Sequence, residues 1–397
     1  MTPPSSFRLL HIIPDLDPRS GGTVSALVGL AIAQSRKLGW NVSVVTCATQ
    51  TTDHRAIDQL RESGVAVPVL PVPKRFLPGK EFRERIAELI GNSDLVHVHA
   101  VWEELQHVAC RTAAKMNVPY IVSPHGMLDP WSLAKGRLKK SLYLRLRLKK
   151  DLDRALFIHC TTMQEMSLIA DLEIKSPKRV IPNGIDLSEF REVEDRGQEP
   201  GSREWFYEKY PHARGRPVVA FLSRLHPKKG LDLLLPSFAQ LKSEDALLVL
   251  AGPGNEAYVN DLKQKCKKLD IDHRVVFTGM LQGAQRISVL RIADVFVLPS
   301  YQENFGIAVA ESLAAGTPVV ISDQVNFSEY LQGVEFAAVV RLENSLVSNA
   351  ISSFLMPSEE ESAKRSSAAK AFANSFSFDV VAEKWSDSLA ASNHKST

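Results

Sequence analysis

The chain has 397 residues, too many for one ordinary hydrophobic core, which predicts two domains of common size. Apolar residues make up 44% of the sequence and charged residues 23%, proportions typical of folded globular proteins that exclude general disorder and fibrous repeats. The formal net charge of +3 is too small for this length to indicate a nucleic-acid partner.

The cysteines and the longest apolar runs bear on the cellular compartment. Four scattered cysteines, Cys47, Cys110, Cys160 and Cys266, lack the spacing of a metal site and read as buried thiols. The N-terminal run Phe7–Ile13 is too short for a signal sequence, and no apolar run approaches the ~20 residues of a membrane span. We therefore expect a cytoplasmic protein, with a peripheral position at the inner face of the membrane left open.

Short apolar runs alternate with amphipathic stretches, which predicts parallel sheets covered by helices on both faces. The first series of predicted strands is Arg8–Ile13, Val42–Cys47, Ala66–Leu70, Leu95–His99, Tyr120–Ser123, Leu156–Cys160 and Val180–Ile181. The second series is Val218–Ser223, Leu247–Ala251, Val275–Thr278, Val295–Leu298 and Pro318–Ile321.

A turn-rich break separates the two series. It is Pro182-Asn183-Gly184-Ile185-Asp186, followed by the charged and poorly periodic segment Arg191–Arg203, where we place the hinge. The predicted fold class is α/β, with two Rossmann-like doubly wound domains at residues 1–186 and 187–376. Residues 377–397 are predicted to form a helix, with Val381 and Trp385 on one face, that packs back on the first domain.

The first candidate motif follows the first predicted strand. Ser20-Gly21-Gly22-Thr23 precedes the amphipathic stretch Val24–Lys37, where glycines allow close backbone approach and helix-start amides can receive an anion. An ordinary turn with a helix cap explains this loop equally well by itself. The loop does not match GxGxxG, which disfavours a nicotinamide dehydrogenase.

Histidines mark the carboxyl edge of the first sheet. Ser123-Pro124-His125-Gly126 follows a predicted strand, so His125 can donate a hydrogen bond to a sugar hydroxyl or orient the reacting groups. The alternative is a hydrogen-bonded loop histidine. His97 and His99 share one face of a strand, but no third metal ligand is indicated, and we expect two satisfied core histidines.

The second domain carries a basic loop after its first strand. Arg224 and Lys229, five residues apart in Ser223–Gly230, can converge on a diphosphate and neutralise the charge of a leaving group. Lys228 is expected to be solvated. The loop lacks GxxxxGK[ST], which disfavours ATPase chemistry, and the turn Ala251-Gly252-Pro253-Gly254 is expected to border a nucleotide.

The most informative segment is Pro299–Ile307, which leads into the predicted helix Ala308–Ala315. Glu303 precedes this helix and Glu311 lies about two turns along it, so the two carboxylates are not expected to form an acid/base dyad. Glu311 suits a ribose diol, Glu303 suits hexose hydroxyls, and the amides of Asn304–Gly306 suit phosphate. The alternative is a helix-dipole acid and an exposed helix glutamate, but the apolar neighbours of Glu311 favour a buried, engaged carboxylate.

With these motifs in order, the sequence resembles the retaining GT-B glycosyltransferases of glycosyltransferase family 4 (glycosyl transferases group 1). The resemblance covers nearly the whole chain. Its most specific signature is Glu-x7-Glu, met by Glu303 and Glu311 and followed by Ala314–Val319. The family commonly has Glu-Gly-Phe-Gly where this chain has Glu303-Asn304-Phe305-Gly306, which leaves the donor sugar undetermined.

The resemblance implies an N-terminal acceptor domain and a C-terminal domain for a nucleoside-diphosphate sugar, the only cofactor-like molecule expected. It assigns the donor to Gly22, Arg224, Lys229, Glu303, Asn304, Phe305, Gly306 and Glu311. It assigns catalysis to His125, Glu303, Arg224 and Lys229, with no metal and no enzymic nucleophile. The resemblance therefore implies transfer of a hexose or related sugar to a saccharide or lipid-linked acceptor, in polysaccharide or glycoconjugate assembly. A nucleotide-sugar epimerase and a non-catalytic nucleotide-sugar binder are the alternatives.

A basic stretch in the first domain has no place in these motifs. Residues 135–150 contain no acidic residue, and Leu138, Leu142 and Leu146 recur every four residues. One hypothesis is contact between a basic helix and an anionic membrane, with a lipid-linked acceptor. The alternative is a solvated helix whose leucines face the core.

Overall fold

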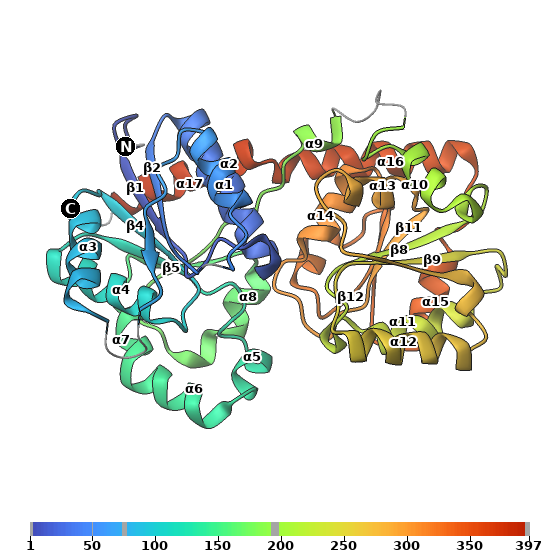
Figure 1. The fold of residues 1–397 in the computed structure, drawn as a ribbon, viewed down its shortest axis with the longest axis horizontal. Helices are drawn as coiled ribbons and strands as arrows, with labels where there is room; N and C mark the ends of the chain where they lie inside the picture. Colours follow the sequence, from blue (N-terminus) through green and yellow to red (C-terminus); the bar gives the residue numbers. More distant parts are fainter. Residues whose placement is uncertain (1–2, 50, 74–77, 192–197, 394–397) are drawn as a thin grey trace. The chain divides into compact units, whose positions relative to one another are not determined.

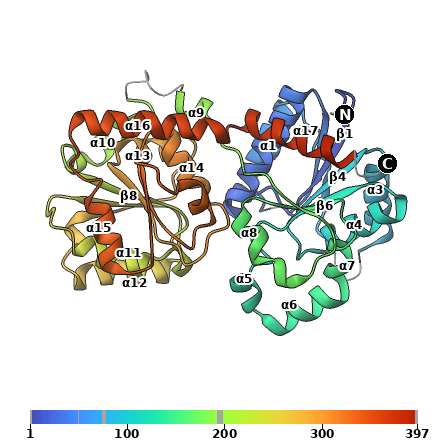
Figure 2. The same cartoon turned by 180° about the vertical axis from the view of Figure 1, so that it is seen from behind.

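The computed structural model describes residues 3–49, 51–73, 78–191 and 198–393. The chain divides into two compact units (Figures 1 and 2). Unit 1 is Met1–Gly184 with Phe378–Thr397, and unit 2 is Ile185–Ser377. The predicted boundaries after residues 186 and 376 lie two residues and one residue from these divisions. Of the predicted hinge, residues 192–197 lie outside the described part of the chain.

Unit 1 is built on a parallel sheet of seven strands in the order β3-β2-β1-β4-β5-β6-β7. The strands are β1 (Arg8–Ile12), β2 (Asn41–Ala48), β3 (Val69–Pro71), β4 (Leu95–His99), β5 (Tyr120–Ser123), β6 (Phe157–Cys160) and β7 (Lys178–Val180). The helices are η1 (Pro18–Ser20), α1 (Gly22–Leu38), α2 (Arg55–Glu62), α3 (Lys80–Gly91), α4 (Glu104–Met116), α5 (Pro130–Ala134), α6 (Arg137–Tyr143), η2 (Leu144–Leu148), α7 (Lys149–Leu152), α8 (Met163–Leu168), η3 (Ala170–Leu172) and α17 (Phe378–Asn393).

Two apolar cores cover the two faces of this sheet. Leu27 of α1, Ile57 of α2 and Trp385 of α17 belong to one core. Ile86 of α3 and Ala109 of α4 belong to the other. Alternate residues of the five central strands enter opposite cores, so these strands read as largely apolar runs.

Unit 2 is built on a parallel sheet of six strands in the order β10-β9-β8-β11-β12-β13. The strands are β8 (Val218–Leu222), β9 (Leu247–Ala251), β10 (Val275–Gly279), β11 (Val295–Leu298), β12 (Val319–Ser322) and β13 (Ala337–Val340). The helices are α9 (Ser188–Arg191), α10 (Arg203–Lys209), η4 (Pro211–Ala213), η5 (Pro227–Lys229), α11 (Leu231–Ala239), α12 (Glu256–Lys268), η6 (Asp272–Arg274), α13 (Gln285–Ile292), α14 (Ile307–Ala314), η7 (Asn326–Leu331), α15 (Asn344–Ser352), α16 (Glu359–Ala373) and η8 (Asn374–Phe376).

Helix α17 returns to unit 1 although it follows unit 2 in the sequence. Val381, Trp385 and Leu389 are buried in the core that α1 also lines. Phe378 docks where α1 has Gly29, and a Cβ at that glycine would lie 2.0 Å from the phenyl ring. The C-terminal helix is therefore part of the core of unit 1.

Each sheet has one point where the strand order reverses. In unit 1 it lies between β1 and β4, and in unit 2 between β8 and β11. Loops that leave the carboxyl ends of two such strands turn to opposite faces of the sheet, and the space between them is where doubly wound proteins bind ligands. The Gly21-Gly22 loop follows β1, whereas the Arg224–Lys229 and Glu303–Gly306 loops follow β8 and β11.

Three sequence-based expectations need comment. β13 was not predicted, and the third predicted strand, Ala66–Leu70, is a single bridge at Ala66 followed by β3 at Val69–Pro71. All four cysteines are free and buried, which confirms the expectation for them. No helix within the described residues combines the length and the apolar character needed to cross a membrane.

Candidate active site

The loops after β8 and β11 touch each other at the switch point of unit 2. Gly230 ends the η5 turn with φ +71°, and a Cβ there would lie 1.9 Å from the carbonyl oxygen of Pro299. The backbone amide of Tyr301 donates to the carbonyl of Lys228 at 2.9 Å. Only glycine allows this approach, which brings the end of the basic loop beside the acidic one.

An ion pair between Lys229 and Glu303 joins the two loops. The side chains are 12% and 18% exposed, and Lys229 Nζ donates to Glu303 Oε2. Burial raises the pKa of Glu303, but Lys229, Lys228 and Arg224 together lower it by more, and the net pKa is below its ordinary value. Glu303 is therefore a carboxylate facing three cations, and the surplus positive charge suits a diphosphate.

The backbone of the acidic loop is anchored from a third strand. Glu303 N donates to the Gln324 carbonyl at 3.2 Å, and Asn326 N donates to the Glu303 carbonyl at 3.0 Å, both just beyond β12. Phe305 is buried and packs edge-on against Phe327 with ring centroids 5.0 Å apart. The phenyl ring of Phe305 is thus a core anchor, so the predicted donor contact of this residue falls to its backbone amide at the start of α14.

Glu311 lies in α14 beside a guanidinium that sequence reasoning missed. Arg286 Nε donates to Glu311 Oε1 at 3.2 Å, and the same guanidinium pairs with Glu189 of α9. Burial lowers the pKa of Arg286, but the carboxylates of Glu311 and Glu189 raise it above its ordinary value. The alternative of an exposed helix glutamate is wrong, because the Glu311 side chain is only 15% exposed. Arg286 and Glu189 stand outside every motif, so no local signal identified them.

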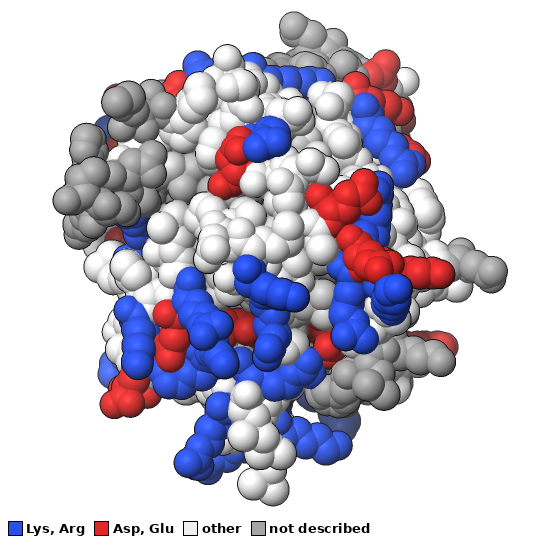
Figure 3. Space-filling view, turned by 90° about the vertical axis from the view of Figure 1, so that its left-hand side faces the viewer, with Lys and Arg blue, Asp and Glu red and all other residues white. Residues whose placement is uncertain are grey.

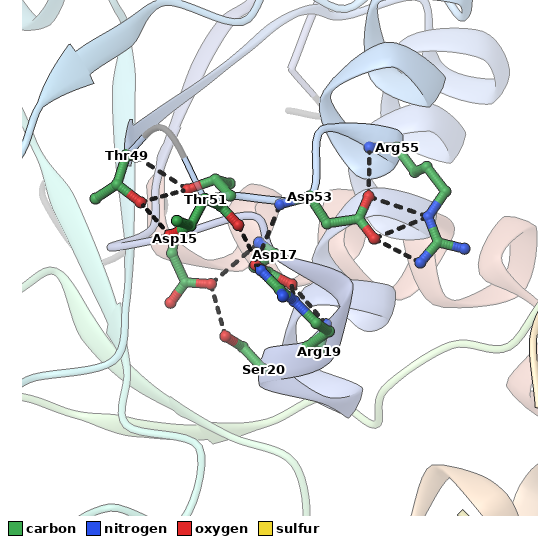
Figure 4. Close-up of polar contacts among 9 residues, drawn as sticks. Asp15, Asp17, Arg19, Ser20, Thr49, Thr51, Asp53 and Arg55 are labelled. Carbon is green, nitrogen blue, oxygen red and sulfur yellow. Dashed lines mark hydrogen bonds and ion pairs between the residues drawn. The ribbon is translucent and has the colours of Figure 1, made fainter. Parts of the chain in front are cut away.

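A network of polar contacts holds the loop after β1 in unit 1 (Figure 4). Asp17 caps η1, accepting from Arg19 N at 2.9 Å and from Arg19 Nε at 2.8 Å. Arg19 also donates to the Thr51 carbonyl at 2.6 Å, and Asp53 N donates to Asp17 at 3.2 Å. These bonds tie the loop after β1 to the segment after β2. The hydrogen bond from Arg19 lowers the pKa of Asp17 well below its usual range.

This anchoring places the start of α1 at the switch point of unit 1. Ser20 Oγ donates to Asp15 at 2.7 Å, and Gly22 is the first residue of α1. The helix has seventeen residues and no acidic residue in its first turn. Its N-terminal amides and helix dipole therefore present positive potential where the sequence predicts a phosphate contact of Gly22.

His125 lies in a tightly held turn after β5. Its φ of +52° is unusual for a residue other than glycine. The adjacent Gly126 N donates to Glu165 Oε1 at 2.6 Å, and Glu165 Oε2 accepts from Thr161 N at 2.7 Å. Glu165 is 1% exposed and was missed by sequence reasoning, since nothing in the motif points to a carboxylate forty residues downstream. It fixes the backbone that carries His125.

A buried chain of imidazoles connects His125 to helix α1. Gln34 Oε1 lies 2.8 Å from His11 Nε2, His11 Nδ1 lies 2.9 Å from His99 Nε2, and His99 Nδ1 lies 3.0 Å from His125 Nε2. If the Gln34 oxygen faces His11, each imidazole in turn carries its proton on Nε2, and His125 Nε2–H donates to His99. The orientation of one amide thus sets the tautomer of His125.

A second branch shares the same face of the sheet. Ser123 Oγ lies 2.6 Å from both His97 Nε2 and His159 Nδ1, and His159 Nε2 donates to the Ile181 carbonyl at 2.8 Å. Trp385 of α17 packs against both histidines of this branch, with ring centroids 4.7 Å from His97 and 4.6 Å from His159. The expectation that His97 and His99 are satisfied core residues is confirmed by their hydrogen bonds and burial.

Burial keeps these histidines neutral. It lowers the pKa of His11 and His159 to about 4, the pKa of His125 to about 3, and those of His97 and His99 well below the ordinary value. The sequence indicates no third metal ligand beside His97 and His99, but the structure brings His11 to them, and nitrogens of the three residues lie within 4.8 Å of one another. Both ring nitrogens of His11 and His99 are nevertheless engaged in hydrogen bonds.

Two family models match the chain, one in each unit. Residues 21–184 match the family model described as glycosyl transferase 4-like domain, and residues 202–371 match glycosyl transferases group 1. The chain belongs to the GT-B glycosyltransferases of the family-4 type. The matched ranges contain the Gly22 and His125 loops in unit 1 and the Arg224, Lys229, Glu303 and Glu311 positions in unit 2.

Curated relatives of this glycosyltransferase are distant. The alpha-monoglucosyldiacylglycerol synthase of Streptococcus pneumoniae is 29% identical over 257 residues, which is 64% of this chain and 57% of that protein. The D-inositol 3-phosphate glycosyltransferase of Nocardia farcinica is 27% identical over 338 residues, 79% of this chain and 73% of that protein. These relatives support a transferase enzyme.

Solved structures support the GT-B fold of this glycosyltransferase. Anabaena HepE in complex with UDP and glucose has a TM-score of 0.75 and 19% identity, covering 97% of this chain and 100% of that chain. WaaG, described as a glycosyltransferase involved in lipopolysaccharide biosynthesis, has a TM-score of 0.67 and 17% identity, covering 96% and 98%. At these identities the likeness concerns the fold alone.

Proposed function

We propose that this glycosyltransferase moves a hexose or related sugar, with retention, from a nucleoside-diphosphate sugar to a saccharide or lipid-linked acceptor in cell-surface polysaccharide or glycoconjugate biosynthesis. The observation that carries the proposal is the Lys229–Glu303 pair at the switch point of unit 2, with Arg224 and Lys228 beside it. The HepE structures contain UDP and UDP-glucose, which supports a diphosphate donor. Family membership favours transfer over the epimerase and the non-catalytic binder.

The ion pair suggests how the donor is received. Without donor, Lys229 and Glu303 satisfy each other. A diphosphate gives Lys229 and Arg224 a better anionic partner, which releases Glu303 to accept hydrogen bonds from sugar hydroxyls. Backbone amides of residues 304–306 at the start of α14 add donors to the phosphate or sugar. Glu311, held by Arg286, accepts from the ribose diol.

The proposed chemistry needs no metal and no enzymic nucleophile. The bond between the anomeric carbon and the diphosphate oxygen breaks, and the acceptor oxygen attacks from the same face. The departing diphosphate takes the acceptor proton, and Arg224 and Lys229 stabilise its negative charge. From unit 1 the resemblance assigns Gly22 to the diphosphate and His125 to the transferred sugar. A neutral imidazole at His125 suits a hydrogen bond rather than a charge.

We further propose that a lipid-linked acceptor is met at an anionic membrane. The alternative in which Leu138, Leu142 and Leu146 face the core is contradicted, because they are 87%, 60% and 69% exposed. Exposed leucines flanked by Lys139 and Arg145 suit a helix that lies in a lipid interface. The enzyme would then work at the inner face of the membrane.

A thermal-shift panel of UDP, GDP, ADP and their hexose conjugates tests the donor site. A ligand present at a hundred times its Kd adds about 2.7 kcal/mol to the free energy of unfolding. We expect one nucleotide family to stabilise the wild type and to lose most of this effect with Glu311→Ala. Glu208→Ala, an exposed glutamate of α10, is the matched control. A folded protein that responds to none of these nucleotides would overturn the donor proposal.

A further inference from the structure

A basic groove opens on unit 1 between α3, α4 and the α7 region. Its volume is about 1050 Å3. Arg83 of α3, Arg111 and Lys115 of α4, Lys150 of α7 and Arg154 line it. Figure 3, which faces this side of unit 1, shows lysines and arginines gathered in a band across the surface. None of these residues belongs to the motifs assigned to the donor.

The carboxylates that line the groove are already engaged. Glu104 accepts from Arg147 at 3.1 and 2.9 Å through its two oxygens. Asp151 accepts from His107, and Glu84 pairs with Lys80 along α3 at 3.6 Å. Glu104 and Glu84 therefore have cationic partners of their own and do not neutralise the other cations of the groove.

Five cations of the groove have no acidic partner among the described residues. Arg83, Arg111, Lys115, Lys150 and Arg154 are exposed, and none of them forms an ion pair with another residue in the described part of the chain. Like charges gathered on one concave surface repel each other and raise the local concentration of anions. An arrangement of this kind suits a ligand with several phosphate groups, because guanidinium groups bind phosphate oxygens in pairs.

The groove continues into the exposed leucine strip. Helix α6, the π-helical turn η2 and α7 form one unbroken run, Arg137–Leu152. The run presents Leu138, Leu142 and Leu146 to solvent, while Arg147 and Lys150 line the groove. Binding of a soluble anion would not explain why leucines are exposed beside its site. A lipid surface offers both a layer of phosphates and an apolar interior.

We propose that this groove binds the phosphate headgroups of anionic lipids, while the leucine strip of the adjoining helix inserts between their acyl chains. The inference rests on the membrane contact proposed above and adds a second site to it, which shares only Arg147 and Lys150 with the basic stretch 135–150. Two separate signals, one electrostatic and one apolar, give firmer attachment than either alone.

The test is sedimentation of the full-length protein with vesicles of phosphatidylcholine alone or mixed with phosphatidylglycerol. We expect binding to the anionic vesicles only, weakened by raised salt. Arg111→Gln with Lys115→Gln should lower the partition coefficient about thirty-fold, since each cation near the surface contributes about five-fold. Lys267→Gln with Lys268→Gln, exposed on α12 of unit 2, makes the same change in net charge and should have little effect.

Three further measurements test the two parts of the proposal, the leucine strip and the groove. Leu138→Ser with Leu142→Ser should weaken binding while leaving its salt dependence intact. Equal loss in the groove and control variants would overturn the site, because it would reduce the effect to net charge. Inorganic phosphate that stabilises the wild type but not the groove variant, with unchanged vesicle binding, would replace the lipid by a soluble anion. A normal nucleotide response in the groove variant separates this test from that of the donor site.

Discussion

The buried imidazole chain makes unit 1 sensitive to acid at the scale of single residues. His11 has a folded-state pKa of about 4, below the ordinary 6.5, because burial opposes its protonation. Its contribution to stability is complete above about pH 6.5 and is lost as pH falls toward 4, since the unfolded chain takes up the proton first. The full loss for this residue is about 3 kcal/mol.

We therefore predict that the free energy of unfolding falls between pH 6.5 and 4, and that His11→Asn has a shallower profile. Urea denaturation across this pH range measures both. His212→Asn, at an exposed position, should reproduce the wild-type slope. A wild-type stability that is constant from pH 6.5 to 4 would contradict the neutral chain.

The Lys229–Glu303 pair yields a second prediction at this scale. Glu303→Gln leaves a largely buried ammonium without its carboxylate and should cost about 2 kcal/mol of stability in the absence of donor. The double variant Lys229→Met/Glu303→Gln should recover part of that loss, although both proteins lose donor binding. A double-mutant cycle of denaturation midpoints measures the coupling. Additive effects of the two changes would show that the pair is not coupled.

Sequence reasoning located individual site residues unevenly. Glu303, Lys229 and Arg224 carry their own motif, and the structure brings them together at adjacent loops. Arg286 contacts Glu311, 25 residues away in the sequence, and Glu165 contacts Gly126, 39 residues away. No local sequence pattern indicates partners at such separations. A sequence can thus name the groups that face a ligand more readily than the groups that hold them in place.

At the scale of elements, the close approach of two loops depends on Gly230. Gly230→Ala would place a methyl group 1.9 Å from the Pro299 carbonyl oxygen, so the loops after β8 and β11 must separate. We expect a loss of stability well above the ~1 kcal/mol of left-handed strain alone, together with loss of the nucleotide response. Gly215→Ala is the matched control, because its φ is +78° but its Cβ would meet no atom within 4 Å. Equal stability of the two variants would contradict the role of the contact.

The positions of strands with strong apolar runs were predicted well from the sequence, whereas those of edge strands were not. β9 and β11 are buried along their length, β8 is buried except at its last residue, and all three read as continuous apolar runs. β13 (Ala337–Val340) is a partly buried edge strand, so its sequence lacks that signal. The basic stretch 135–150 was predicted as one helix, and the structure confirms a helical run with a π turn in its middle.

At the scale of the whole molecule, the chain crosses between its two units twice. Helix α17 follows unit 2 in the sequence but completes the core of unit 1. The alternation of strands and helices predicts two doubly wound domains, because each parallel strand needs a crossover helix. It does not predict which core Trp385 enters. That depends on contacts with α1 and with the imidazoles of β4 and β6, more than two hundred residues upstream.

The last prediction concerns this returning helix. Trp385 is 2% exposed and contacts His97, His159 and Phe157, so Trp385→Ala should destabilise unit 1 by about 3–5 kcal/mol through the cavity it leaves. Glu383→Ala, on the solvent side of the same helix, removes only an exposed ion pair with Lys37 and should change stability little. Hydrogen exchange read by mass spectrometry separates the two units. Faster exchange in β1, β4 and β6 with unchanged protection in β8 and β11 is the expected pattern, because the helix belongs to the first core alone. Equal loosening of both sheets would mean that the units unfold as one and that α17 couples them.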